Sequence, residues 1–111
     1  MLRETTKHIP NVEVVSFHGL LNEYAMEHGA TIIIRGLRAL SDFEYEFQRA
    51  LLMKKVEPNI ETVFIMTSTQ YSYISSTGIR ELACFGGKLD DMVPDYVEAR
   101  LKEKFKDKYD V

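Results

Sequence analysis

The sequence predicts an α/β protein, with a Rossmann-like parallel sheet and flanking helices. Short apolar, β-branched runs alternate along the chain with stretches of helical periodicity, and this alternation predicts parallel strands joined by right-handed crossovers. One run, Thr31–Ile34, is apolar at successive positions, as in strands that are buried on both faces. The 111 residues are 45% hydrophobic and 28% charged, which excludes a disordered chain and predicts a single domain over residues 1–111.

Three segments are expected to form strands. Val12–Phe17 is short, rich in valine, and bounded by Pro10-Asn11 and Gly19. Thr31–Ile34 and Glu61–Thr67 are the second and third strands. A three-stranded parallel sheet is small and has two open edges, and the chain starts inside a helix-like stretch. We therefore expect the sequence to be the later part of a larger α/β unit.

Helices are expected before, between and after these strands. Ser41-Asp-Phe-Glu44 has the pattern of a capping box, and Pro94 suits the first turn of a helix. Gly29 and Gly86-Gly87 are placed to end the helices that precede them. The expected helices are Leu2–His8, Leu20–His28, Ser41–Val56, Ser75–Phe85 and one that begins at Pro94.

Composition excludes several classes of function. With 14 basic and 17 acidic residues the net charge is −3, so nothing indicates a nucleic-acid-binding protein. The single cysteine, Cys84, excludes an internal disulfide and suits a reducing compartment. No apolar run is long enough to span a membrane, and the first residues lack the apolar core of a secretory signal. The three histidines lack partners at metal-ligand spacing, so no metal site is predicted in the chain itself.

The first candidate binding segment is Arg35-Gly36-Leu37-Arg38, which is expected to be a loop after the second strand. Ligands of open α/β sheets bind at the carboxyl ends of strands, and paired guanidinium groups suit a phosphate. The alternative is that both arginines pair on the surface with Asp42, Glu44 or Glu46. Glu46 itself either belongs to a stripe of helix-surface ion pairs with Asp42 and Arg49, or orients an arginine or contacts a ligand hydroxyl.

The second candidate segment runs from Tyr71 to Arg80, between the third strand and the following helix. Unpaired N–H groups and the helix dipole make a helix start a ready site for an anion, and three consecutive hydroxyl residues, Ser75, Ser76 and Thr77, add donors. The alternative is a plain N-cap, for which one serine is enough.

These two segments, in this order, resemble phosphopantetheine adenylyltransferase, a family of the nucleotidylyltransferase superfamily. The matching text is IIIRGLRALSDFEYEFQRALLMKK, followed by ETVFIMTSTQYSYISSTGIRELACFGG. RGLRALSDFEYEFQ is highly specific, and ISSTGIR is similar to the superfamily's ISST-x-x-R element. The resemblance covers nearly the whole chain but only the later two thirds or so of a family member.

The resemblance implies the transfer of an adenylyl group from ATP to 4′-phosphopantetheine, with magnesium, to give dephospho-coenzyme A and pyrophosphate. It also implies a cytoplasmic homohexamer with coenzyme A as a possible feedback ligand. In this sequence Arg38 would be catalytic, while Leu21 and Arg35 would bind 4′-phosphopantetheine. The implied ATP-binding residues are Gly36, Leu37, Arg38, Glu46, Tyr71, Ser72, Tyr73, Ile74, Ser75, Ser76 and Thr77.

Three departures from the family pattern bear on activity. Tyr71 stands where many members have tryptophan, and Arg80 where many have lysine. The family's N-terminal strand, its phosphate loop with a His-x-Gly-His element and a following lysine have no counterpart in this text, and His8, His18 and His28 do not match that element. Two hypotheses follow: the chain is part of an adenylyltransferase and is inactive alone, or it is a non-catalytic module that binds a nucleotide or coenzyme A, or serves in assembly.

Overall fold

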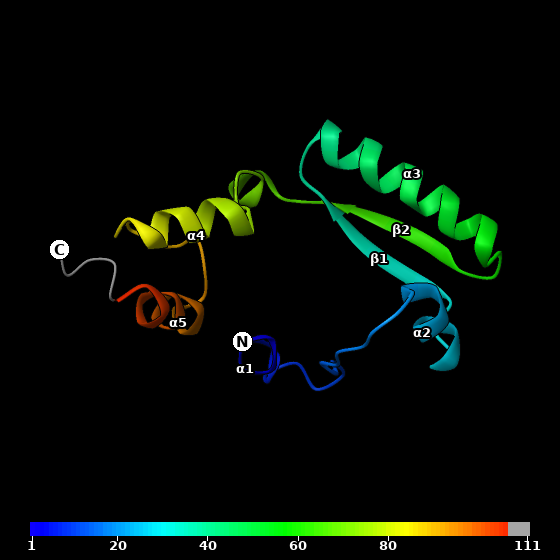
Figure 1. The fold of residues 1–111 in the computed structure, drawn as a ribbon, viewed down its shortest axis with the longest axis horizontal. Coiled ribbons are helices and arrows are strands. Elements are labelled where there is room, and N and C mark those ends of the chain that lie inside the picture. The colour runs from blue at the N-terminus through cyan, green and yellow to red at the C-terminus, as the bar shows by residue number, and fades with distance from the viewer. Residues whose placement is uncertain (107–111) are drawn as a thin grey trace. The chain divides into compact units, whose positions relative to one another are not determined.

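The computed structural model describes residues 1–106. Its elements are α1 (Leu2–Thr6), α2 (Leu21–Glu27), β1 (Ile32–Leu37), α3 (Leu40–Val56), β2 (Glu61–Met66), the 3₁₀ turn η1 (Thr69–Tyr71), α4 (Ser76–Cys84) and α5 (Asp95–Phe105). The chain divides into two compact units, one formed by Ser16–Tyr73 and the other by Met1–Val15 with the chain from Ile74 onward. Figure 1 shows the elements of both units along the chain.

The unit Ser16–Tyr73 contains a parallel pair of strands, β1 and β2, and α3 connects them. The strands pair in register from Ile32 opposite Glu61 to Leu37 opposite Met66. The backbone N–H of Thr67 donates to the Leu37 carbonyl at 2.8 Å, so the two strands end level with each other. Figure 1 shows α3 lying along both strands. The predicted α/β class with a Rossmann-like parallel sheet and flanking helices is confirmed.

The two faces of this sheet differ sharply. The side chains of Ile33, Arg35 and Leu37, at alternate positions of β1, lie on the face that α3 covers. On the same face, the Phe43 ring of α3 contacts the Phe64 ring of β2 edge-on, with ring centroids 6.4 Å apart. The opposite face is apolar and open. Its side chains keep large exposed fractions: 60% for Ile32, 64% for Ile34, 44% for Val63 and 55% for Ile65. Thr31–Ile34 has the apolar run typical of a strand buried on both faces, but Ile32 and Ile34 are exposed among the described residues, as expected for a part of a larger α/β unit.

The prediction of a strand at Val12–Phe17 is also wrong. This segment has no regular secondary structure, and the described residues contain only a two-stranded sheet. A β-branched run fits a strand only when a neighbouring strand accepts and donates its backbone hydrogen bonds, and none of the residues 1–106 does this for Val12–Phe17.

Two boundaries near the candidate binding segment are corrected. Arg35, Gly36 and Leu37 belong to β1 rather than to a loop, because their alternation continues that of the isoleucines before them. The helix expected to start at Ser41 starts at Leu40 instead, with Ala39 as the N-cap and no side-chain cap. The capping box is therefore not formed, although the end at Val56 is as predicted.

In the other unit α4 packs on α5. Its buried core is formed by Ile79 and Ala83 of α4, Leu101 of α5 and Leu89 between them. Pro94 is the N-cap of α5, one residue from the predicted start. The predicted single domain over residues 1–111 stays a prediction, and residues 107–111 lie outside the described part. Among residues 1–106, no helix combines the length and apolar character that a membrane crossing requires.

Candidate functional site

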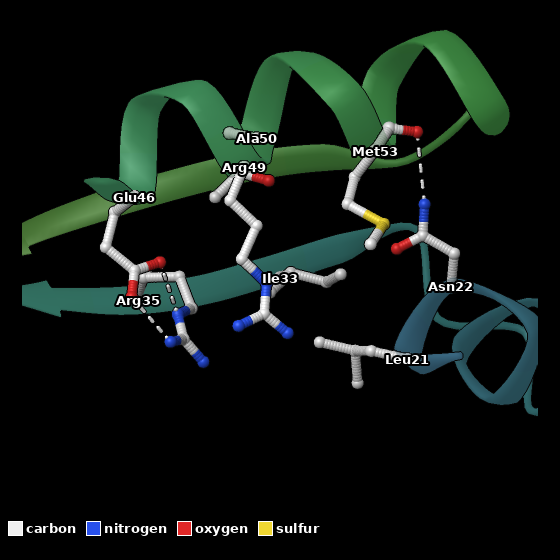
Figure 2. A pocket seen from close by; sticks show the side chains of 9 residues that line it. Leu21, Asn22, Ile33, Arg35, Glu46, Arg49, Ala50 and Met53 are labelled. Carbon is white, nitrogen blue, oxygen red and sulfur yellow. Dashed lines mark hydrogen bonds and ion pairs between the residues drawn. The ribbon is translucent and has the colours of Figure 1, made fainter. Parts of the chain in front are cut away.

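A pocket in the unit Ser16–Tyr73 lies where α2, β1 and α3 approach one another (Figure 2). Its floor is apolar and its rim carries both charges. The lining residues are Leu21, Asn22, Ile33, Arg35, Glu46, Arg49, Ala50, Met53 and Thr62. The α3 members Glu46, Arg49, Ala50 and Met53 recur at spacings of three and four, which places them on one helix face.

Arg35 and Glu46 form a two-pronged ion pair across this pocket. The Arg35 Nε donates to Glu46 Oε2 at 2.9 Å, and Nη2 donates to Oε1 at 2.7 Å. The exposed fraction of the side chain is 38% for Arg35 and 13% for Glu46. Hydrogen bonding by Arg35 lowers the pKa of Glu46 below its ordinary value, and the same bond raises the pKa of Arg35. The arginine is thus held in one orientation and fully charged.

Arg49 adds a second cation to the rim. Figure 2 shows the guanidinium groups of Arg35 and Arg49 projecting to the same side of the sheet, with the Ile33 side chain beside Arg49. The Arg49 charge also helps to lower the pKa of Glu46. Two guanidinium groups against one carboxylate give the pocket a positive balance, and Leu21, Ala50 and Met53 supply an apolar wall. Such a pocket suits an anion that carries an apolar chain.

Arg38 lies at the carboxyl end of β1 and pairs with Asp42 in the first turn of α3. Its Nε donates to Asp42 Oδ2 at 3.0 Å, and its backbone N–H donates to the same oxygen at 3.3 Å. The hydrogen bond from Arg38 lowers the pKa of Asp42. Arg38 and Leu37 line a second, open cavity of about 310 Å³, with Met66 and Thr67 across the strand ends.

The other predicted nucleotide-binding residues of this unit are surface residues. Gly36 faces away from α3, and an added side-chain carbon there would meet nothing within 4 Å. Tyr71 and Tyr73 are exposed by 48% and 67%. The Ser72 hydroxyl donates to the Thr69 carbonyl at 3.0 Å within the turn η1.

The predicted hydroxyl run lies in the other unit, at the start of α4. Ser75 is the N-cap, and its Oγ accepts a hydrogen bond from the backbone N–H of Gly78 at 3.1 Å. Ser76 and Thr77 are the first helical residues, and Ile74 packs against the core formed by α4 and α5. The capping alternative is therefore observed, while binding of an anion at this helix start stays a prediction.

Comparison with known proteins identifies the chain's relatives. Residues 1–82 match the family described as cytidylyltransferase-like. The chain belongs to the cytidylyltransferase-like family. The parallel β1-β2 pair with its α3 crossover agrees with this assignment.

Two curated relatives of this cytidylyltransferase-like chain are both named phosphopantetheine adenylyltransferase. The protein of Caldanaerobacter subterraneus subsp. tengcongensis is 58% identical over 106 residues, which are 96% of this chain and 66% of the relative. That of Carboxydothermus hydrogenoformans is 54% identical over 105 residues, 95% of this chain and 65% of the relative. The resemblance drawn from the sequence is confirmed, and the chain spans slightly less than two thirds of the length of these relatives.

The unit Ser16–Tyr73 brings together Leu21, Arg35 and Glu46, which the sequence analysis singled out separately. Arg38 lies in the second cavity instead. The ion-pairing alternative holds for both arginines, and the loop predicted around them is a strand end. The roles of these residues in binding stay predictions.

Five of the lining residues are not predicted as site residues from the sequence: Asn22, Ile33, Ala50, Met53 and Thr62. Arg49 is interpreted there only as part of a surface stripe. The helical spacing of Arg49 from Glu46 could have revealed its place. Asn22 lies between Leu21 and Glu23 in the sequence, and this setting gives no sign that its side chain is buried.

Proposed function

We propose that this chain forms part of an enzyme that transfers an adenylyl group from ATP to 4′-phosphopantetheine, giving dephospho-coenzyme A and pyrophosphate. The observation that carries the proposal is the pocket of Leu21, Arg35 and Glu46, found in a chain 58% identical to a relative named for this activity. The geometry supports it because a fixed arginine lies beside an apolar wall, and 4′-phosphopantetheine combines a phosphate with a chain that is partly apolar.

In this proposal Arg35 binds the phosphate of 4′-phosphopantetheine. Its bonds to Glu46 use Nε and Nη2, so the other N–H groups of the guanidinium are oriented but not consumed. Arg49 strengthens the positive field, and Leu21 lines the wall along which the rest of the substrate lies. Fixing one substrate in this way supplies the orientation on which an in-line transfer depends.

ATP is assigned to the cavity at the ends of β1 and β2. Arg38 is the proposed catalytic residue there, because a guanidinium beside the reacting phosphates stabilises the charge that develops during transfer. Gly36 and Leu37 provide backbone at the same strand end. Tyr71, Ser72, Tyr73, Ile74, Ser75, Ser76 and Thr77 are proposed nucleotide contacts from the resemblance, and the α4 start supplies N–H groups suited to phosphate.

Magnesium belongs to the proposal as the ion that accompanies ATP. Residues 1–106 contain no group of three or more histidine, cysteine, aspartate or glutamate side chains that could hold a metal ion. Magnesium bound mainly through substrate phosphates needs no such group, and no step proposed for these residues depends on the ion.

The finer expectations belong to the same proposal: a cytoplasmic homohexamer, and coenzyme A as a feedback ligand of the phosphopantetheine pocket. Sedimentation of the purified protein tests the assembly. Displacement of bound 4′-phosphopantetheine by coenzyme A tests whether the two ligands share the pocket.

The direct test measures binding and turnover separately. Calorimetry with 4′-phosphopantetheine should show binding that is lost in Arg35→Ala and kept in Arg100→Ala, which removes an exposed arginine from α5. Pyrophosphate release from ATP and 4′-phosphopantetheine with magnesium then reports catalysis. Because the chain is expected to be inactive alone, turnover is measured before and after a separately made N-terminal segment is added. Binding with turnover only after this addition would support the proposal, and binding without turnover in either case would favour a nucleotide- or coenzyme A-binding module. Absence of binding would overturn the proposal.

A further inference from the structure

Asn22 is the one buried polar side chain in the core of residues 1–106. Its exposed fraction is 2%, and it lines the pocket beside Leu21. Its Nδ2 donates to the Met53 carbonyl at 3.1 Å, whereas its Oδ1 has no hydrogen-bond partner among the described residues. Because a carbonyl can only accept, the atom that faces Met53 must be the amide nitrogen. The unpartnered atom is therefore an acceptor.

The bond to Met53 does not explain why an asparagine is present. The Met53 carbonyl already accepts the backbone N–H of Glu57 at 2.9 Å, as expected at the end of α3. Removing the Asn22 amide would therefore leave no orphaned carbonyl. A leucine has nearly the same branched shape and would avoid burying an unpaired oxygen, which is unfavourable for folding.

We propose that Asn22 is a specificity-determining residue whose Oδ1 accepts a hydrogen bond from an amide N–H of the ligand in this pocket. The inference rests on the proposed function, since 4′-phosphopantetheine carries amide groups beyond its phosphate. The phosphate binds at Arg35, the chain follows Leu21 and Ile33, and an amide N–H reaches Asn22.

The pocket has room for this contact. Figure 2 shows Asn22 Oδ1 directed toward the space beside the Met53 thioether, on the pocket side of α2. The pocket as a whole has a cavity volume of about 20 Å³, enough for one small polar group. The end of the Met53 side chain is unbranched and flexible, so it moves aside readily when the ligand enters.

The test compares 4′-phosphopantetheine with analogues in which each amide N–H in turn is replaced by an ester oxygen. The informative comparison uses the analogue that lacks the N–H proposed to reach Asn22. Calorimetry measures the affinity of both ligands for the wild-type chain and for Asn22→Leu. The wild type should bind the ester about tenfold more weakly than the amide, the effect of one lost hydrogen bond. Asn22→Leu should bind the two ligands equally. Asn59→Leu, which changes an exposed asparagine before β2, should keep the wild-type ratio.

The outcomes separate this inference from the proposed function. Failure of the wild type to bind 4′-phosphopantetheine would overturn both. Tight binding with no preference for the amide, or the same preference in Asn22→Leu, would overturn the role of Asn22 alone. Asn22→Leu should also unfold at a denaturant concentration no lower than the wild type. A clear fall would assign Asn22 to folding rather than to the ligand.

Discussion

Arg35 and Glu46 are joined by two hydrogen bonds, of 2.9 and 2.7 Å, that tie β1 to the second turn of α3. The strand fixes one partner and the helix the other, so the guanidinium cannot turn without breaking both bonds. A phosphate meeting this group finds a preorganised cation, and little side-chain entropy is lost on binding.

In a full-length enzyme, Arg35→Ala should raise the Michaelis constant for 4′-phosphopantetheine by about 10- to 100-fold, as expected for lost charged hydrogen bonds, with a smaller effect on turnover. Arg35→Lys should recover only part of the loss, because an ammonium group cannot make the paired bonds to Glu46. Steady-state kinetics with each substrate varied in turn provides the measurement. Full recovery by lysine would show that charge alone matters.

In the same full-length enzyme, Arg38→Ala should act mainly on turnover. A contact that strengthens as charge develops lowers the barrier, and its removal can cost about a hundredfold in kcat. Asp42→Asn is the companion variant, because it keeps Arg38 but removes the carboxylate it binds. Kinetic profiles of Arg35→Ala and Arg38→Ala that coincide would contradict this division of roles.

The Glu46 carboxylate should make the folding stability depend on pH in the acidic range. Arg35 lowers its pKa in the folded chain, so the folded state binds fewer protons than the unfolded state at mildly acidic pH. The stabilisation is complete above the ordinary glutamate pKa of about 4.3 and is lost as pH falls through the lower folded value. Urea unfolding should show that the difference in the free energy of unfolding between wild type and Glu46→Gln becomes smaller as the pH falls. Glu44→Gln, which removes an exposed carboxylate from the same helix, should follow the wild-type profile.

The start of α4 should be protected by ATP. Ser75 caps the helix through Gly78, and a phosphate would add bonds to the neighbouring N–H groups. Amide exchange at residues 75–80 should slow when ATP is added to a complete enzyme. Ser75→Ala should cost about 1 kcal/mol of stability through the lost cap. Protection elsewhere with none at these residues would mean that the serine serves only as a cap.

The open face of the sheet should cause self-association of the purified chain. Ile34 and Val63 are register partners on this face, with exposed fractions of 64% and 44%. Sedimentation velocity should show association that rises with concentration, and Ile34→Thr with Val63→Thr should reduce it while preserving β-branched strand residues. Threonine substitution at Val12 and Val15, which are exposed outside the sheet, is the matched control. Equal association in both double variants would locate the contact elsewhere.

Helical periodicity and strand alternation were enough to predict the α/β class, the Val56 end of α3 and the Ser75 cap. The errors have physical causes. Val12–Phe17 has the composition of a strand, but pairing depends on a neighbour that local sequence does not specify. A loop is predicted at Arg35 and Gly36 because the apolar run of the strand ends at Ile34. They instead continue the alternation of β1, since the Arg35 side chain gains Glu46 across the helix interface.

The candidate site could be predicted only in part. Leu21, Arg35 and Glu46 emerged from motifs, but their convergence depends on how α2 and α3 approach β1. The burial of Asn22 depends on the same approach, and an asparagine beside a leucine looks like any surface position in a short amphipathic helix. Arg49 was assigned to the helix surface because its charge gave no indication of which neighbours it faces.

The crossover between β1 and β2 also constrains the order of folding. Every β1-β2 hydrogen bond joins residues separated by the whole of α3, so no strand contact can form before that long connection closes. A helix formed early shortens the connection and presents Phe43 to Phe64, which lowers the entropic barrier to strand pairing. The rate at which this unit folds is therefore expected to depend on α3, even though the arginine proposed to bind the ligand lies in the strand.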